Sequence, residues 1–140
     1  MRSITLILLN DALPFTILWQ QLTDQRSRIG ERTSMTRKIR LCSRADVPAA
    51  GMLPLDIAGL PPVAAFDVGG EIYVTSNVCT HNVALLSDGF FEGDTIECPL
   101  HGGCFNVRTG EATQFPCEVP LQTYPVIVEG GDLYTEIKDH

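Results

Sequence analysis

Positive charge is scarce in this chain of 140 residues, which has 10 Lys and Arg against 17 Asp and Glu and a formal net charge of −7. Proteins that bind nucleic acid need clustered positive charge on one face, and the sequence shows no such cluster. We therefore predict no nucleic-acid partner. Acidic charge fits both steering toward a basic protein partner and solubility alone, and the sequence leaves these two interpretations open.

A long uninterrupted apolar run is also missing. The apolar stretch over residues 3–19 is broken by Asn10, Asp11 and Pro14, whereas a membrane-spanning helix needs about 20 predominantly apolar residues. No convincing small-residue cleavage site follows it, so we predict neither a membrane role nor export. The pattern changes at Met35. We therefore predict an N-terminal extension over residues 1–34 and one domain over residues 35–140, although an extra strand or helix packed on that domain stays open.

The cysteine count gives no disulfide framework. Five cysteines are present, and an odd number without an export signal argues against a scaffold of disulfides. We predict a cytoplasmic protein in which some cysteines serve as metal ligands. The other cysteines, Cys42, Cys104 and Cys117, are predicted to be small buried apolar residues.

Helical periodicity is absent after residue 35, where short apolar runs alternate with Gly, Pro and Asp. Two pairs of runs surround Gly-Gly turns and predict hairpins over 62–77 and 124–137. Two further short strand pairs are predicted over 89–99 and 104–113. The fold class is therefore all-β, an antiparallel sandwich or barrel with loops projecting from it.

Two of the three histidines lie beside cysteines. Cys79 and His81 stand in "CTH", and Cys98 and His101 stand in "CPLH", with sixteen residues between His81 and Cys98. Thiolate and imidazole are soft and borderline metal ligands, and two mixed pairs on adjacent loops match the Cys₂His₂ ligation of a Rieske [2Fe–2S] centre. A structural zinc site is the alternative, but its cysteines usually form a pair of their own. A Cys–His dyad needs only one of the two pairs.

From about Lys38 to Lys138 the sequence resembles the Rieske ferredoxins, through "CTH", "CPLHGG" followed by Phe105, and "FPCEVPL". The resemblance is greatest to the ferredoxin components of bacterial aromatic-ring-hydroxylating dioxygenases. It implies the Rieske fold, with a β-sandwich or barrel base and a small cluster-binding subdomain of loops. It also implies one [2Fe–2S] cluster, whose inner iron is held by Cys79 and Cys98 and whose outer iron is held by His81 and His101.

The same resemblance bears on the reduction potential. High-potential members join the two loops by a disulfide, at positions that are Ala84 and Leu100 here. They also place hydroxyl donors where this chain has Gly103 and Phe105. Fewer donors stabilise the reduced cluster less, so we predict a potential toward the low end of the roughly −150 to +300 mV Rieske range.

Two features of the loops that flank the cluster remain open to a plainer interpretation. The pair Gly102–Gly103 predicts close approach of the backbone to the cluster, or a simple turn. Pro116 in "FPCEVPL" predicts a stiffened loop over the cluster, or ordinary loop punctuation.

The function implied is electron transfer without catalysis. The chain has no G-x-G-x-x-G fingerprint for a dinucleotide. Apart from His81 and His101 its one histidine is His140, so a 2-His-1-carboxylate iron site cannot be built. The resemblance implies a soluble one-electron carrier between an NAD(P)H-dependent flavoprotein ferredoxin reductase and a terminal oxygenase. A Rieske subunit of another multicomponent redox enzyme is the alternative, and a zinc-stabilised binding module is a third possibility.

Asp88, Glu92 and Asp94 are either steering charges or solvated loop residues.

Overall fold

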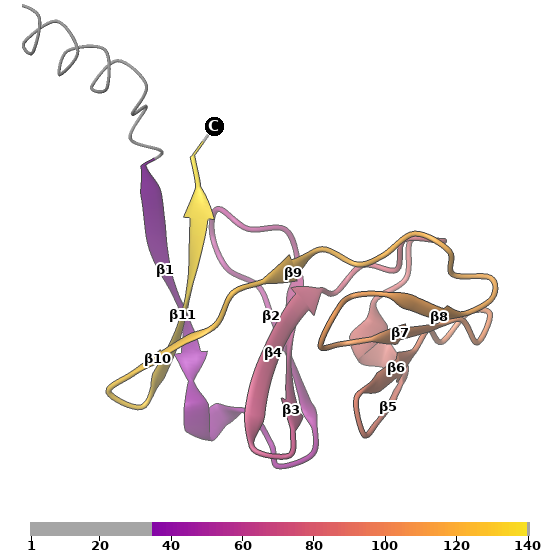
Figure 1. Cartoon of the computed structure of the whole chain (residues 1–140), viewed down its shortest axis with the longest axis horizontal. Coiled ribbons are helices and arrows are strands. Elements are labelled where there is room, and N and C mark those ends of the chain that lie inside the picture. The colour runs from indigo at the N-terminus through magenta and orange to yellow at the C-terminus, as the bar shows by residue number, and fades with distance from the viewer. Residues whose placement is uncertain (1–34, 140) are drawn as a thin grey trace, which may run out of the picture. The chain divides into compact units, whose positions relative to one another are not determined.

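A computed structural model describes residues 35–139 of the chain, and the predicted extension over residues 1–34 lies outside them. Residues Thr36–Lys138 form one compact unit of antiparallel strands (Figure 1). The prediction of an all-β fold is confirmed. The strands are β1 Thr36–Ser43, β2 Met52–Leu55, β3 Val63–Val68, β4 Glu71–Ser76, β5 Phe90–Glu92, β6 Thr95–Glu97, β7 Cys104–Asn106, β8 Ala112–Gln114, β9 Thr123–Tyr124, β10 Ile127–Glu129 and β11 Asp132–Lys138.

The strands form three sheets, in the orders β1-β11-β10, β2-β3-β4-β9 and β5-β6-β7-β8. The first sheet joins the two ends of the compact unit, because Thr36 pairs with Lys138 and Ser43 pairs with Asp132. In the part of the chain that the structure describes, no helix is long and apolar enough to cross a membrane.

Strand β3 lies between two hydrophobic cores, which explains why all of its residues except Asp67 are apolar. Ala64, Phe66 and Val68 pack in one core, whereas Val63 and Ala65 pack in the other. Successive side chains of a strand point to opposite faces, so a strand buried on both faces has no polar alternation. The predicted hairpin from β3 to β4 is confirmed, with Val68 paired to Glu71 across the Gly-Gly turn.

The last predicted hairpin needs a correction. The run "YPVIVE" is not one strand: Tyr124 pairs with Val74 in the second sheet, whereas Ile127 pairs with Tyr134 in the first. Pro125 separates them, and proline has no N–H to donate to a ladder. This segment therefore passes from one sheet to the next.

The two short strand pairs predicted over 89–113 are also not separate hairpins. Glu97 pairs with Cys104, and this joins them into one four-stranded sheet, β5 to β8. The connection between β6 and β7 is the "CPLHGG" segment, which starts from Cys98. The sequence-predicted subdomain of loops is therefore a small sheet that carries the loops, at one end of the unit in Figure 1.

Candidate metal centre

Two loops carry the Cys–His pairs, and backbone hydrogen bonds close each of them at its base. In the first, the Cys79 N–H donates to the Ala84 carbonyl at 2.9 Å. In the second, the Cys98 N–H donates to the Gly103 carbonyl at 2.7 Å, and the Gly102 N–H donates back to Cys98 at 3.2 Å. Each cysteine thus stands at the start of a tight loop whose tip carries the histidine.

The four predicted ligands divide into an inner and an outer pair. Cys79 and Cys98 are both 3% exposed and belong to the core that contains Phe66. His81 and His101 are exposed, and their ring centroids lie 5.6 Å apart in an edge-to-face arrangement. The structure therefore brings the two thiols together at the edge of the core and the two imidazoles together at the surface.

Backbone N–H groups of the loop tips point at the two sulfur atoms. Burial opposes ionisation of Cys79, but hydrogen bonds from the Asn82 and His81 backbone outweigh it and lower the pKa of Cys79. Burial raises the pKa of Cys98, against hydrogen bonds from the Leu100 and His101 backbone. Hydrogen bonds to a charged form favour that form, so the backbone donors of both loops favour a thiolate, although burial outweighs them at Cys98.

A third loop, over residues 115–121, covers the first two. The Thr80 hydroxyl donates to the Val119 carbonyl at 2.7 Å. Directly before the loop, the side-chain amide of Gln114 at the end of β8 donates to the Gly102 carbonyl at 3.1 Å. Cys117 is buried in this loop, with its Sγ 3.7 Å from Cys79 Sγ. Burial, together with the nearby Cys79, raises the pKa of Cys117 to about 12.

The burial of the three remaining cysteines, Cys42, Cys104 and Cys117, is confirmed. The sequence interpretation nevertheless missed the contact of Cys117 with Cys79. The available signal was a cysteine inside "FPCEVPL", the segment already predicted to cover the ligands. Gly103 makes room for this contact, because a Cβ there would overlap Cys117 Sγ and lie 3.1 Å from the Cys117 backbone N.

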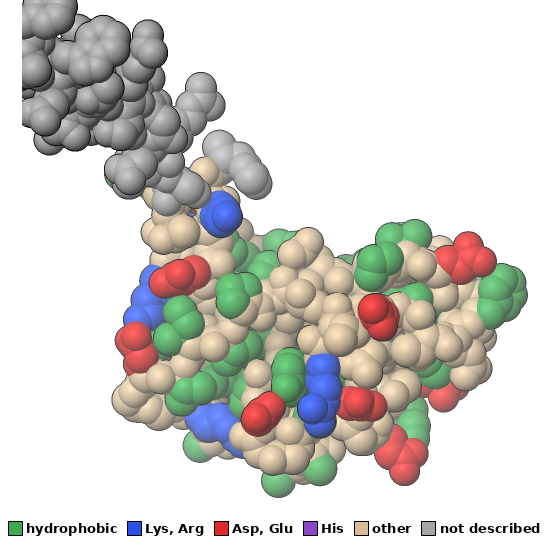
Figure 2. All heavy atoms as spheres, viewed as in Figure 1, with side chains coloured by type: hydrophobic (Ala, Val, Ile, Leu, Met, Phe, Trp, Pro, Cys, Tyr) green, Lys and Arg blue, Asp and Glu red, His purple; other side chains and the backbone are tan. Residues whose placement is uncertain are grey.

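The surface around these loops is acidic. Residues 79–121 contain six Asp and Glu and one cation, Arg108. On the face shown in Figure 2, the outer end of the β5–β8 sheet exposes acidic and apolar side chains. Asp88 and Glu92 are both exposed.

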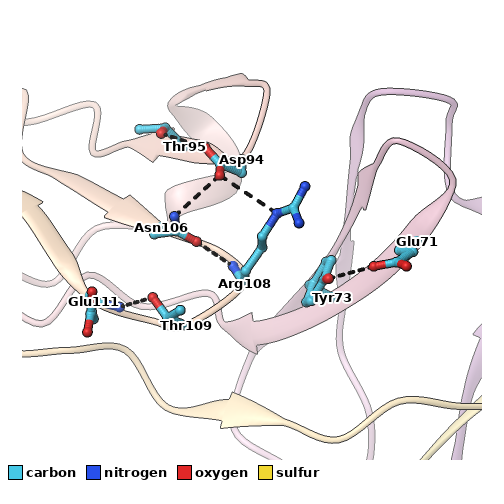
Figure 3. A network of polar contacts seen from close by, with 8 residues as sticks. All are labelled: Glu71, Tyr73, Asp94, Thr95, Asn106, Arg108, Thr109 and Glu111. Atoms are coloured by element: carbon cyan, nitrogen blue, oxygen red, sulfur yellow. Dashed lines mark hydrogen bonds and ion pairs between the residues drawn. The ribbon is translucent and has the colours of Figure 1, made fainter.

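Asp94 has structural partners. It accepts a hydrogen bond from the Asn106 amide at 3.3 Å and lies 3.7 Å from Arg108 Nε (Figure 3). The Arg108 guanidinium in turn lies 5.7 Å from the centre of the Tyr73 ring on β4. Arg108 therefore connects the β5–β8 sheet, which carries the loops, to the β2-β3-β4-β9 sheet.

The described residues 35–139 contain no group of three His, Cys, Asp or Glu side chains arranged around one metal ion. A two-iron cluster does not need such a group, because each iron takes two protein ligands and the bridging sulfides complete its coordination. Two buried thiols and two exposed imidazoles are a donor set of this kind.

Comparison with known proteins decides the family. The Rieske [2Fe-2S] domain model matches residues 37–125. The chain belongs to the Rieske [2Fe–2S] domain family. The resemblance stated from the motifs is confirmed, and the cofactor is one Rieske-type [2Fe–2S] cluster.

Several relatives of this Rieske chain are ferredoxins of similar length to its domain. It is 44% identical over 103 residues to the 3-phenylpropionate/cinnamic acid dioxygenase ferredoxin subunit of Escherichia coli K12, covering 73% of this chain and 95% of that protein. The Sphingomonas yanoikuyae B1 ferredoxin has a similar structure, with a TM-score of 0.70 and 42% identity over 72% of this chain and 99% of that one.

A third similar structure contains a partner. It is a complex of reduced oxygenase and oxidized ferredoxin in carbazole 1,9a-dioxygenase, with a TM-score of 0.66, 40% identity, and coverage of 70% of this chain and 91% of that one. Matches that cover nearly the whole length of these ferredoxins describe an electron-transfer component and not a catalytic oxygenase subunit.

Proposed function

We propose that this Rieske ferredoxin carries single electrons from an NAD(P)H-dependent flavoprotein ferredoxin reductase to the terminal oxygenase of an aromatic-ring dioxygenase, in the cytoplasm. The observation that carries the proposal is the pair of loops that presents two imidazoles at the surface above two buried thiols. The relatives named as dioxygenase ferredoxins, and the solved oxygenase–ferredoxin complex, support the choice of partner.

In this proposal Cys79 and Cys98 hold the inner iron, and His81 and His101 hold the outer iron. The division follows the burial of the side chains, since the exposed imidazoles face the partner while the thiols face the core. The cluster, when bound, accepts and releases one electron.

The protein's own residues supply shielding and presentation. The core that contains Phe105, Leu86 and Ile96 lies against the thiol side, and the loop over residues 115–121 lies beside the first ligand loop. These groups exclude water from the sulfur atoms, and the exposed His81 and His101 form the side from which an electron leaves. Contacts of redox carriers are small and weak, so the partner is released quickly.

Docking uses the acidic and apolar surface around the histidines. Leu100 and Val83 are exposed large apolar side chains beside His101 and His81. Opposite charges on carrier and partner accelerate encounter at low ionic strength. A rate of reduction by the reductase that falls as salt is added supports a charge-steered encounter, and a rate independent of salt contradicts it.

The ligand assignment is tested by EPR of the dithionite-reduced protein, prepared without air. A rhombic signal with hyperfine coupling from two imidazole nitrogens is the expected result. The variant Cys79→Ser should abolish that signal, whereas the control Cys42→Ser, at a buried thiol in the other core, should retain it. A signal without nitrogen coupling means that the histidines are not ligands.

The electron-transfer role is tested with the ferredoxin reductase and oxygenase of the 3-phenylpropionate/cinnamic acid system. Oxidation of the aromatic acid that depends on added ferredoxin is the expected result. A chain that shows the correct EPR signal, but is not reduced by any dioxygenase reductase offered, belongs to another redox system.

A further inference from the structure

The thiol of Cys117 lies against a ligand sulfur and has no role in the function described so far. Its Sγ is 3.7 Å from Cys79 Sγ, and the residue is 4% exposed. It comes from the third loop, 38 positions along the chain from Cys79. Within residues 35–139, the one polar atom recorded within bonding distance of this thiol is the sulfur of Cys79.

The direction of the hydrogen bond at this contact follows from ligation. A cysteine that binds a metal is a thiolate, so Cys79 has no proton to donate once it is a ligand. A buried thiol that is not a ligand keeps its proton, because burial disfavours the charged form. The donor at this contact is therefore Cys117.

The position of Cys117 is fixed from several sides. Gly103 leaves room for the sulfur, since a Cβ there would overlap Cys117 Sγ. The hydrogen bond from Thr80 to Val119 fastens the third loop to the first ligand loop. Gln114, the last residue of β8 before the third loop, donates to Gly102 in the second ligand loop. The thiol is held at the ligand sulfur by its loop and does not depend on a flexible side chain to reach it.

We propose that Cys117 is a tuning residue, whose S–H donates a hydrogen bond to the Cys79 ligand sulfur and raises the reduction potential of the cluster. Reduction adds one electron and increases the negative charge on the sulfur ligands, and a donor stabilises that charge more in the reduced state than in the oxidised one. No proton is transferred. The proposal depends on the ligand role of Cys79 in the proposed function.

The donor compensates in part for groups that this chain lacks. Gly103 and Phe105 carry no hydroxyl, so within the described residues Cys117 is the non-ligand side chain that reaches a ligand sulfur. A thiol of the covering loop then supplies a donor that the second ligand loop does not.

The test is the reduction potential of the full-length holoprotein, measured by anaerobic optical titration. Cys117→Ala should lower the equilibrium ratio of reduced to oxidised protein about fivefold at a fixed potential, which is roughly 40 mV at 59 mV per tenfold for a one-electron couple. Cys117→Ser keeps a donor and should recover most of this loss. The control Cys104→Ala removes a thiol that donates to the Gly102 carbonyl and not to a ligand sulfur, and it should leave the potential unchanged.

A second measurement does not depend on changing Cys117. In Cys42→Ala/Cys104→Ala, Cys117 is the only thiol that is not a ligand, so the protein has one infrared S–H stretching band. We expect this band to move to lower frequency on reduction, because the hydrogen bond strengthens.

The outcomes separate this inference from the proposed function. An intact EPR signal with two imidazole nitrogens, together with an unchanged potential in Cys117→Ala or an unmoved S–H band, overturns the tuning role alone. Loss of the EPR signal in Cys117→Ala with retention in Cys79→Ala makes Cys117 the ligand, and overturns both this inference and the ligand assignment.

Discussion

Replacing Gly103 with alanine tests how tightly the covering loop packs on the metal centre. Gly103 follows the second ligand loop and is buried. An added Cβ would overlap Cys117 Sγ and lie 3.1 Å from both the Cβ and the backbone N of Cys117. The sulfur has little room to move aside, because it already touches Cys79 at 3.7 Å.

The loss of stability in Gly103→Ala follows from the number of contacts that the added methyl group disturbs. Adding a methyl group to a well-packed core typically costs about 1–3 kcal/mol, and here both a side chain and the backbone of Cys117 are in the way. We therefore expect about 3 kcal/mol of destabilisation from Gly103→Ala. For a domain of about 100 residues this lowers the midpoint of thermal unfolding by roughly 15 °C. The reduction potential should fall as well, because Cys117 is displaced from Cys79.

The assay is urea unfolding of the oxidised holoprotein, followed by far-ultraviolet circular dichroism. Cys117→Ala removes the overlapping sulfur, so Gly103→Ala should cost at least about 1 kcal/mol less in that background than in the native chain. Contacting residues show interaction energies of this size in double-mutant cycles. If the two substitutions are additive to within about 0.5 kcal/mol, the overlap is not the source of the cost and the reasoning fails.

Three further predictions concern the base of the domain. Asp67 is 4% exposed and accepts hydrogen bonds from Arg44 at 3.1 Å and from the Gly70 N–H at 2.8 Å. Asp67→Ala should lower the free energy of unfolding in urea by about 2–3 kcal/mol. Asp67→Asn should lower it by about 1 kcal/mol less, because the asparagine oxygen still accepts from Gly70. Equal costs would mean that the bond to Gly70 contributes nothing. Burial, and secondarily a nearby carboxylate, raises the pKa of Cys42, which lowers its thiolate fraction at pH 8. Iodoacetamide should therefore modify Cys42 in urea but not in the native protein, as read by mass spectrometry, and equal rates would contradict its burial. A chain that begins at Met35 should bind the cluster and unfold at the same urea concentration as the full chain, and loss of the cluster would show that residues 1–34 belong to the domain.

The strand signals in the sequence were strongest where the backbone itself sets the structure. Gly69 and Gly70 have φ of +61° and +94°, which glycine adopts at little cost, and the hairpin around them was predicted correctly. The run "YPVIVE" was interpreted wrongly because local pattern does not reveal which sheet a strand joins. Strand β2 was missed, since Pro54 lowers its strand signal; proline is tolerated in this strand because it lies at the edge of its sheet.

The sequence was enough to predict the cluster family, because "CTH" and "CPLH" place unlike ligands at short spacings that few metal sites use. It also determined the all-β class, since alternation and turn residues are local properties of the chain. The contact of Cys117 with Cys79, and the space that Gly103 leaves for it, became visible in the folded structure. Such contacts depend on how separate loops pack, and a residue's neighbours across 38 positions are not encoded in its own stretch of sequence.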